Sequence, residues 1–140
     1  MNFAQIITDL KRDEGVVLHA YQDSLGLWTI GIGRLIDPRK GGGISEKEAV
    51  MLLTHDLERI MTDLDTRIPW WTHQPEPVQR ALVNMAFNLG VPGLMGFKGM
   101  LAALQARNYV EAAKAALDSK WAKQVGDRAR RVADLLRSAH

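Results

Sequence analysis

Two carboxylic residues near the N-terminus, Glu14 and Asp23, are spaced so that they could work as an acid/base pair. Glu14 is expected at the C-terminal end of a helix, where the helix dipole disfavours an ionised carboxylate and so favours a bound proton. Asp23 is expected in a solvated turn, where a carboxylate stays ionised. Two carboxyl groups in such different environments can divide the roles of acid and base, as hydrolysis of a glycosidic bond requires.

Thr29 lies six residues after Asp23, and its hydroxyl could orient a water molecule. The spacing alone leaves a second interpretation open, because Asp in a turn and Glu at a helix end are also common as ordinary surface residues. The chain has no cysteine and four scattered histidines. These counts exclude a thiolate nucleophile and a disulfide framework, and they predict no metal site.

The element that must position Glu14 is a helix at the N-terminus. Apolar residues recur there at the spacing of an amphipathic helix, and Gly15 is a natural stop for it. Residues 17–35 then alternate apolar side chains with glycines. This pattern predicts a turn at 23–26 and a strand at 28–32. Glycines within such a strand are typical of a bend or of close approach by another chain segment.

The remainder of the sequence is expected to be helical, after a loop at 37–43. Ser45 and Glu48 form a capping box, and the helix that follows should run to about Arg67. At about 1.5 Å per residue this helix would span roughly 30 Å, enough to join two lobes. Further helices are predicted over 77–89, with Gly90 as the stop, and over 98–107, 109–118 and 127–138.

Composition is that of one globular domain: 140 residues, 46% of them apolar and 24% charged. The longest apolar runs have five residues, so no membrane-spanning helix is predicted, and the N-terminus has no secretory signal pattern. Trp70 and Trp71 are expected to pack where the long helix meets the C-terminal helices, with a glycan-stacking platform as the alternative.

Charge is uneven along the chain. Residues 98–140 carry nine Lys and Arg against four Asp and Glu, whereas residues 1–97 carry nine against twelve. The basic third favours an anionic partner, although a solvated helix face is an equal alternative. Nucleic acid is disfavoured as that partner, because there is no zinc spacing, RNA-binding signature or long basic run.

Residues 14–33 read EGVVLHAYQDSLGLWTIGIG. They resemble the signature of phage-type lysozymes, the endolysins of glycoside hydrolase family 24, and meet ten fixed positions of the pattern E-G-x-x-L-x-x-Y-x-D-x-x-G-x-x-T-I-G-x-G. Looser matches continue at 84–90, 96–97, 119–121 and 128–132, so the resemblance covers nearly the whole chain.

The resemblance implies an α+β, mostly helical, lysozyme-like fold of two lobes. A small N-terminal β-hairpin lobe would be joined by a long helix to a helical C-terminal lobe. The chain would be one domain, 1–140, with lobes of about 13–55 and 1–12 plus 56–140. The implied activity is inverting hydrolysis of the β-1,4 bond between N-acetylmuramic acid and N-acetylglucosamine in peptidoglycan, for host cell lysis. No cofactor is implied.

Carried over by position, the resemblance makes Glu14 the general acid, Asp23 the general base or water-orienting carboxylate, and Thr29 a partner in holding that water. An inverting pair should have its carboxyl groups about 6.5–9.5 Å apart. Arg128 matches a buried arginine that pairs with the catalytic glutamate. Leu35 matches a position that lines the sugar-binding cleft.

Phe87 also matches a cleft-lining position, and for both it and Leu35 ordinary packing is the alternative. The sequence departs from the family pattern at Arg34, where histidine is frequent, and we expect Arg34 to pair with Asp56. Met100 and Ala115 replace polar cleft residues, so sugar contacts are not carried over to them.

The implied partner is bacterial peptidoglycan, with no nucleic acid, no stable membrane insertion, surface contact by the basic third, and a monomeric state. Without a signal, the protein would wait in the host cytoplasm before acting on the cell wall. Two other functions remain open from the sequence: a non-catalytic glycan-binding protein of the same fold and a basic helical nucleic-acid binder.

Overall fold

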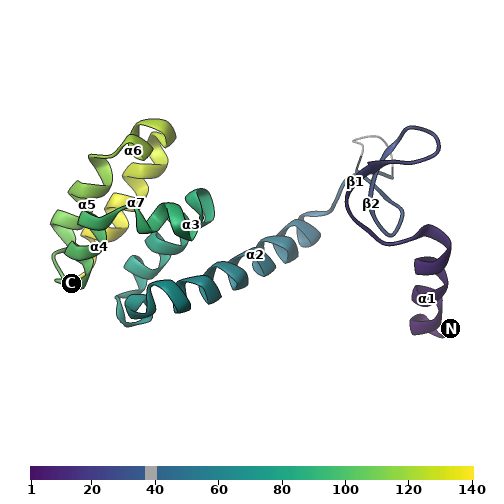
Figure 1. The fold of residues 1–140 in the computed structure, drawn as a ribbon, viewed down its shortest axis with the longest axis horizontal. Helices are drawn as coiled ribbons and strands as arrows, with labels where there is room; N and C mark the ends of the chain where they lie inside the picture. The colour runs from purple at the N-terminus through teal and green to yellow at the C-terminus, as the bar shows by residue number, and fades with distance from the viewer. Residues whose placement is uncertain (37–40) are drawn as a thin grey trace. The chain divides into compact units, whose positions relative to one another are not determined.

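The computed structural model describes residues 1–36 and 41–140, which form seven α-helices, one 3-10 helix and a three-stranded sheet (Figure 1). The predicted α+β, mostly helical fold class is confirmed. The chain divides into two compact units, Met1–Met51 and Leu52–His140. The assignment of residues 1–12 to the C-terminal lobe stays a prediction.

Helix α1, Phe3–Glu14, opens the first unit and places Glu14 at its last position. Asn2 caps its start, because the Asn2 side chain accepts a hydrogen bond from the Gln5 N–H at 3.0 Å. The helix ends at Gly15, whose φ of 76° leaves the helical region and whose N–H donates to the Lys11 carbonyl. The predicted helix and its glycine stop are confirmed.

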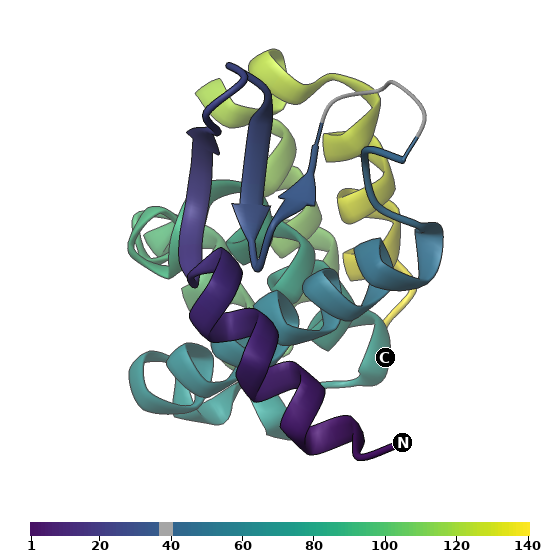
Figure 2. The same ribbon diagram turned by 90° about the vertical axis from the view of Figure 1, so that its right-hand side faces the viewer.

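Strands β1 (Val17–Gln22), β2 (Trp28–Gly31) and β3 (Arg34–Leu35) form an antiparallel sheet in that order (Figure 2). The register pairs Thr29 with Tyr21 on one side and with Leu35 on the other. Thr29 therefore lies on the central strand. Four residue steps along β1, from Val17 to Tyr21, match only two along β2, so β1 carries an irregularity that bends it.

Helix α2, Glu46–Arg67, begins in the first unit with the predicted capping box. Ser45 Oγ accepts a hydrogen bond from the Glu48 N–H, and Glu48 Oε1 accepts one from the Ser45 N–H, both at 3.1 Å. These two bonds satisfy backbone donors that a helix start otherwise leaves unpaired.

The second unit continues from α2 through five more α-helices and holds the apolar core. Every apolar residue that is buried in the described chain belongs to this unit. Trp71 is among them, and its indole N–H donates to Asp65 Oδ1 at 2.7 Å, which confirms its predicted packing role. The elements are η1 (Pro69–His73), α3 (Glu76–Met95), α4 (Lys98–Gln105), α5 (Tyr109–Leu117), α6 (Lys120–Val125) and α7 (Asp127–Arg137).

The helices of the second unit differ from the prediction at the end of α3 and at α6. Gly90 breaks the helical geometry with φ of 77°, as expected, but a further turn continues α3 to Met95. Helix α6 was not predicted, because six residues are too few to show an apolar period; its signal is the cap, where Ser119 accepts a bond from the Ala122 N–H.

Among the described residues, no single helix is long and apolar enough to span a membrane. Helices α3 and α4 meet those criteria only when taken together, and they are bent by 97° relative to each other.

Candidate active site

The carboxyl group of Glu14 lies against the backbone of Gly33 in the turn between β2 and β3. A Cβ atom at Gly33 would stand 3.0 Å from Glu14 Oε2 and 3.2 Å from Glu14 Cδ. Gly33 also has φ of 71°, which L side chains rarely adopt. Position 33 therefore needs glycine for two reasons. Of the two alternatives for these glycines, a bend or the close approach of another segment, Gly33 shows the close approach. The Glu14 side chain itself is exposed.

Replacing Gly33 with Ala should lower the hydrolytic activity that the resemblance implies about tenfold. The new methyl group displaces the carboxyl of Glu14, the predicted general acid, and small misplacements of a reacting group are costly. Gly31→Ala is the matched control: Gly31 has nearly the same φ, 74°, in the same turn, but open space at its Cβ position. Comparing kcat and melting temperature of the two variants separates backbone strain from displacement. If Gly31→Ala lost as much activity as Gly33→Ala, displacement of the Glu14 carboxyl would not explain the loss.

Asp23 is fixed by the turn between β1 and β2. Its Oδ1 accepts hydrogen bonds from the Leu25 N–H at 2.9 Å and the Leu27 N–H at 2.8 Å. The Asp23 N–H in turn donates to the Leu27 carbonyl at 2.9 Å. No donor among the described residues bonds its other oxygen, Oδ2. The carboxylate is thus held in one orientation with one oxygen available for a further partner.

Among the residues of the first unit that the structure describes, Thr29 alone is buried, at 3% exposure. Its Oγ1 donates to the Leu27 carbonyl at 3.0 Å, the same carbonyl that receives the Asp23 N–H. A single peptide, that of Leu27, therefore holds both Asp23 and Thr29. Since the Thr29 proton is committed to Leu27, its hydroxyl oxygen is left as an acceptor.

Each of the three predicted catalytic residues belongs to, or contacts, the segment from Leu27 to Gly33 in the first unit. Thr29 is two residues, or about 7 Å of extended chain, from Leu27, which directly precedes β2, and from Gly31, which ends it. Asp23 is bonded at the first end, and Glu14 contacts the turn that follows the second. The separation of the two carboxyl groups stays a prediction.

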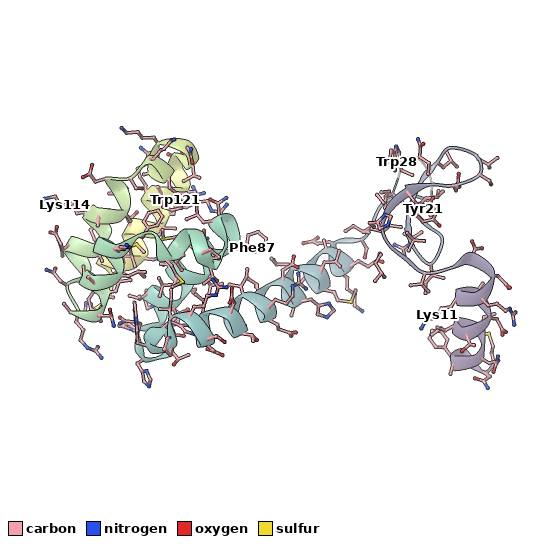
Figure 3. All side chains as sticks on the ribbon, viewed as in Figure 1. Lys11, Tyr21, Trp28, Phe87, Lys114 and Trp121 are labelled. Atoms are coloured by element: carbon pink, nitrogen blue, oxygen red, sulfur yellow. The ribbon has the colours of Figure 1, made fainter. Side chains whose placement is uncertain are left out.

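Leu35 is half-buried and pairs with Thr29 across the sheet. Phe87, on α3 (Figure 3), and Arg128, on α7, belong to the second unit. Both line an apolar groove of about 480 Å³. The Arg128 guanidinium donates from Nε to Asn84 Oδ1 at 2.9 Å and from Nη2 to the Asn84 carbonyl at 3.3 Å. Cleft lining by Leu35 and Phe87, and support of Glu14 by Arg128, stay predictions.

The structure gives Arg34 a different carboxylate from the one expected. Arg34 Nη1 donates to both Glu48 oxygens, at 2.8 Å and 3.0 Å, whereas Asp56 pairs with Arg59 on its own helix. The Arg34–Glu48 pair was not predicted from the sequence, because Glu48 was assigned only the role of capping α2. One carboxylate performs both tasks: its Oε1 accepts from the Ser45 N–H and from Arg34.

The hydrogen bond from Arg34, followed by that from the Ser45 backbone, lowers the pKa of Glu48 from its ordinary value of 4.5 to about 2. A folded-state pKa below the unfolded one stabilises the fold above pH 4.5, and this contribution is lost as the pH falls towards 2. The Arg34–Glu48 pair therefore stays charged through the whole mildly acidic range.

In an NMR titration, the side-chain carboxyl carbon of Glu48 should show a midpoint near pH 2, and in Arg34→Met the midpoint should rise towards 4.5. A Glu48 midpoint that is the same in both proteins would show that Arg34 does not act on it.

No group of three or more acidic or histidine side chains that could hold a metal ion occurs in the part of the chain that the structure describes. The chemistry of the site is that of two carboxylates and a hydroxyl. The absence of a metal or cofactor from the reaction stays a prediction.

The phage lysozyme family pattern matches residues 11–137. The endolysin of Salmonella phage P22 is 35% identical over 79% of this chain and 77% of its own length. Probable T4-type lysozyme 1 of Dictyostelium discoideum is 27% identical over 91% of this chain and 90% of its own length. The pre-baseplate central spike protein Gp5 of Enterobacteria phage T4 is 35% identical over 88% of this chain, which spans only 26% of that protein.

The family match and the P22 endolysin agree with the motif at 14–33 and with the mostly helical fold that carries it. The chain therefore belongs to the phage lysozyme family, whose members hydrolyse peptidoglycan.

Proposed function

We propose that this chain cleaves the β-1,4 bond between N-acetylmuramic acid and N-acetylglucosamine by single-step, inverting hydrolysis. Glu14 is the general acid, Asp23 the general base and Thr29 its partner in holding the attacking water. The observation that carries this proposal is the shared anchoring of Asp23 and Thr29 on the backbone of Leu27. It leaves Asp23 Oδ2 and the acceptor side of the Thr29 hydroxyl without a donor among the described residues.

The orientation of the water follows from these two acceptors. A water molecule that donates one proton to Asp23 Oδ2 and the other to Thr29 Oγ1 turns its lone pairs away from both groups. Those lone pairs are the nucleophile. Because Oδ1 of Asp23 is already bonded to two N–H groups, the carboxylate does not have to reorganise when it takes the proton.

The reaction then balances in one displacement. Glu14 gives its proton to the glycosidic oxygen as the bond from that oxygen to the anomeric carbon breaks. The water oxygen attacks the anomeric carbon from the opposite face, and Asp23 receives the water proton. The products are a new hydroxyl on the leaving sugar and a new reducing end in the α configuration.

Product analysis tests this assignment. Digested peptidoglycan should carry new reducing ends on muramic acid, and NMR of the first product formed should show the α anomer. A β anomer formed first would contradict inversion. New amino groups, released by cleavage at the peptide, would contradict glycosidic hydrolysis altogether.

The remaining roles follow the family resemblance. We assign sugar contact to Leu35 and Phe87 and support of Glu14 to Arg128. We also propose that the protein acts as a monomer on peptidoglycan, binds no nucleic acid and reaches the cell wall from the cytoplasm of the host in which it is made. Clearing of a peptidoglycan suspension by the intact chain and not by Glu14→Gln would exclude a purely glycan-binding role.

The excess of basic residues in 98–140 predicts that activity on the anionic cell wall depends on salt. Since the Debye length shortens from about 30 Å at 0.01 M to about 8 Å at 0.15 M, kcat/KM should fall severalfold over that range. Arg131, an exposed member of the basic set, gives the matched variant: Arg131→Gln should reduce the salt dependence with kcat unchanged. If kcat/KM of the unaltered chain did not change with salt, the basic residues would not draw the protein to the anionic cell wall.

A further inference from the structure

The turn that contacts Glu14 has few internal features that would fix its own conformation. It runs from Gly31 to Gly33, and both glycines have positive φ. Strand β3, which follows, has only two residues. Glycines lose more conformational freedom on folding than any other residue, so such a turn needs constraints from outside.

Arg34, the residue directly after Gly33, supplies those constraints. Its guanidinium donates to both oxygens of Glu48 at 2.8 Å and 3.0 Å and to the Gly43 carbonyl at 3.4 Å. Its backbone pairs with Ile30 in the sheet. Arg34 is therefore attached at once to the start of α2, to the loop before that helix and to strand β2.

Glu48 is itself immobilised. It is the capping residue of α2, bonded to the Ser45 N–H through Oε1 and anchored by its own N–H on Ser45 Oγ. A carboxylate fixed in this way is a rigid anchor for Arg34. A connected set of contacts thus runs from α2 through Glu48 and Arg34 to Gly33, and Gly33 contacts the Glu14 carboxyl.

The pair contributes little to the stability of the fold, because both side chains are partly exposed, at 47% and 36%. Ion pairs between exposed side chains add little to the free energy of unfolding. Their geometric effect can be much larger, since a displacement of about 1 Å at a reacting group can reduce the rate about 100-fold.

We propose that Arg34 and Glu48 are positioning residues that hold Gly33, and through it the carboxyl group of Glu14, in place for proton transfer. The proposal rests on the assignment of Glu14 as the general acid. Under this proposal, two residues of the first unit help to position the Glu14 carboxyl group. Neither of them contacts the sugar or the bond that is cleaved.

Two variants test the role without removing the fold. Arg34→Met retains the aliphatic stem but loses the charge. Glu48→Gln retains an oxygen that can accept the Ser45 N–H, so the cap survives and only the ion pair is weakened. Both should lower kcat about tenfold, leave KM within about twofold and leave the melting temperature nearly unchanged. Arg34→Lys, which keeps the charge, should recover most of the lost kcat.

The matched control is Arg67→Met, which removes an exposed ion pair with Asp63 at 3.1 Å elsewhere on α2. It should leave kcat unaltered. Equal kcat in Arg34→Met and the unaltered chain would overturn the positioning role, as would equal losses in Arg67→Met. Glu14→Gln is measured alongside: if it stays active, the general acid is wrong and the positioning role falls with it, whereas an inactive Glu14→Gln with a fully active Arg34→Met contradicts the positioning role alone.

Discussion

Replacing Glu14 with Gln is expected to lower kcat for peptidoglycan hydrolysis by about 10²–10⁴-fold, the usual contribution of a general acid. Gln has nearly the same shape as Glu and can occupy the same place against Gly33, but it has no carboxyl proton to give. The turn and helix around it should be unaffected, because the Glu14 side chain is exposed and ends the helix that carries it. The melting temperature should therefore stay nearly constant although kcat falls strongly.

The neighbouring residue provides the control. Asp13 is an exposed carboxylate on the same helical turn, paired with Arg12 at 3.2 Å. Asp13→Asn removes the same kind of charge one position away and should leave kcat unchanged. A Glu14→Gln variant with substantial activity, or an Asp13→Asn variant that is equally inactive, would show that the reaction does not depend on a proton at position 14.

Local sequence signals predicted the framework of the site well. Gly15 ends α1, so Glu14 lies at a helix end, and Asp23 lies in a turn whose N–H groups it binds. The capping box of α2 is present as expected. Each of these features depends on residues only a few positions apart, and a short sequence pattern is sufficient to specify it.

Contacts between distant residues were harder to predict. Arg34 binds Glu48, fourteen positions away, instead of Asp56. A carboxylate has enough acceptor positions to cap a helix and bind a guanidinium at once, so assigning Glu48 one role did not exclude another. Likewise, the glycines at 31 and 33 predicted either a bend or a close approach. Only the fold shows that Gly33 is approached by the Glu14 side chain, whereas the Cβ position of Gly31 is open.

The family match identifies the candidate catalytic residues, and the hydrogen bonds of each residue indicate which chemical role it can perform. The motif resemblance at 14–33 and the family membership agree, and the predicted enzyme class is confirmed. The roles of single residues are a separate matter, because a motif does not distinguish a residue that reacts from one that shapes a turn. Asp23 illustrates the difference, since its carboxylate visibly shapes a turn and is also proposed as the base.

Asp23→Asn separates those two roles. The Asn side-chain oxygen can accept the Leu25 and Leu27 N–H groups as Oδ1 does now, so the turn should persist and the melting temperature should hold. The NH₂ group that replaces Oδ2 is a donor and cannot accept a proton from water. We therefore expect kcat to fall at least about 100-fold with the fold intact, as for loss of a general base.

Asp23→Ala is the comparison that shows how much of the loss comes from disrupting the turn. It removes the acceptor as well as the charge, so the Leu25 and Leu27 N–H groups lose their partner at a cost of about 1–3 kcal/mol in the free energy of unfolding. Its kcat should be no higher than that of Asp23→Asn, but its thermal unfolding should come earlier. If Asp23→Asn kept nearly full activity while Asp23→Ala lost it, the carboxylate would act only as the anchor of the turn. The attacking water would then have to be activated by another group.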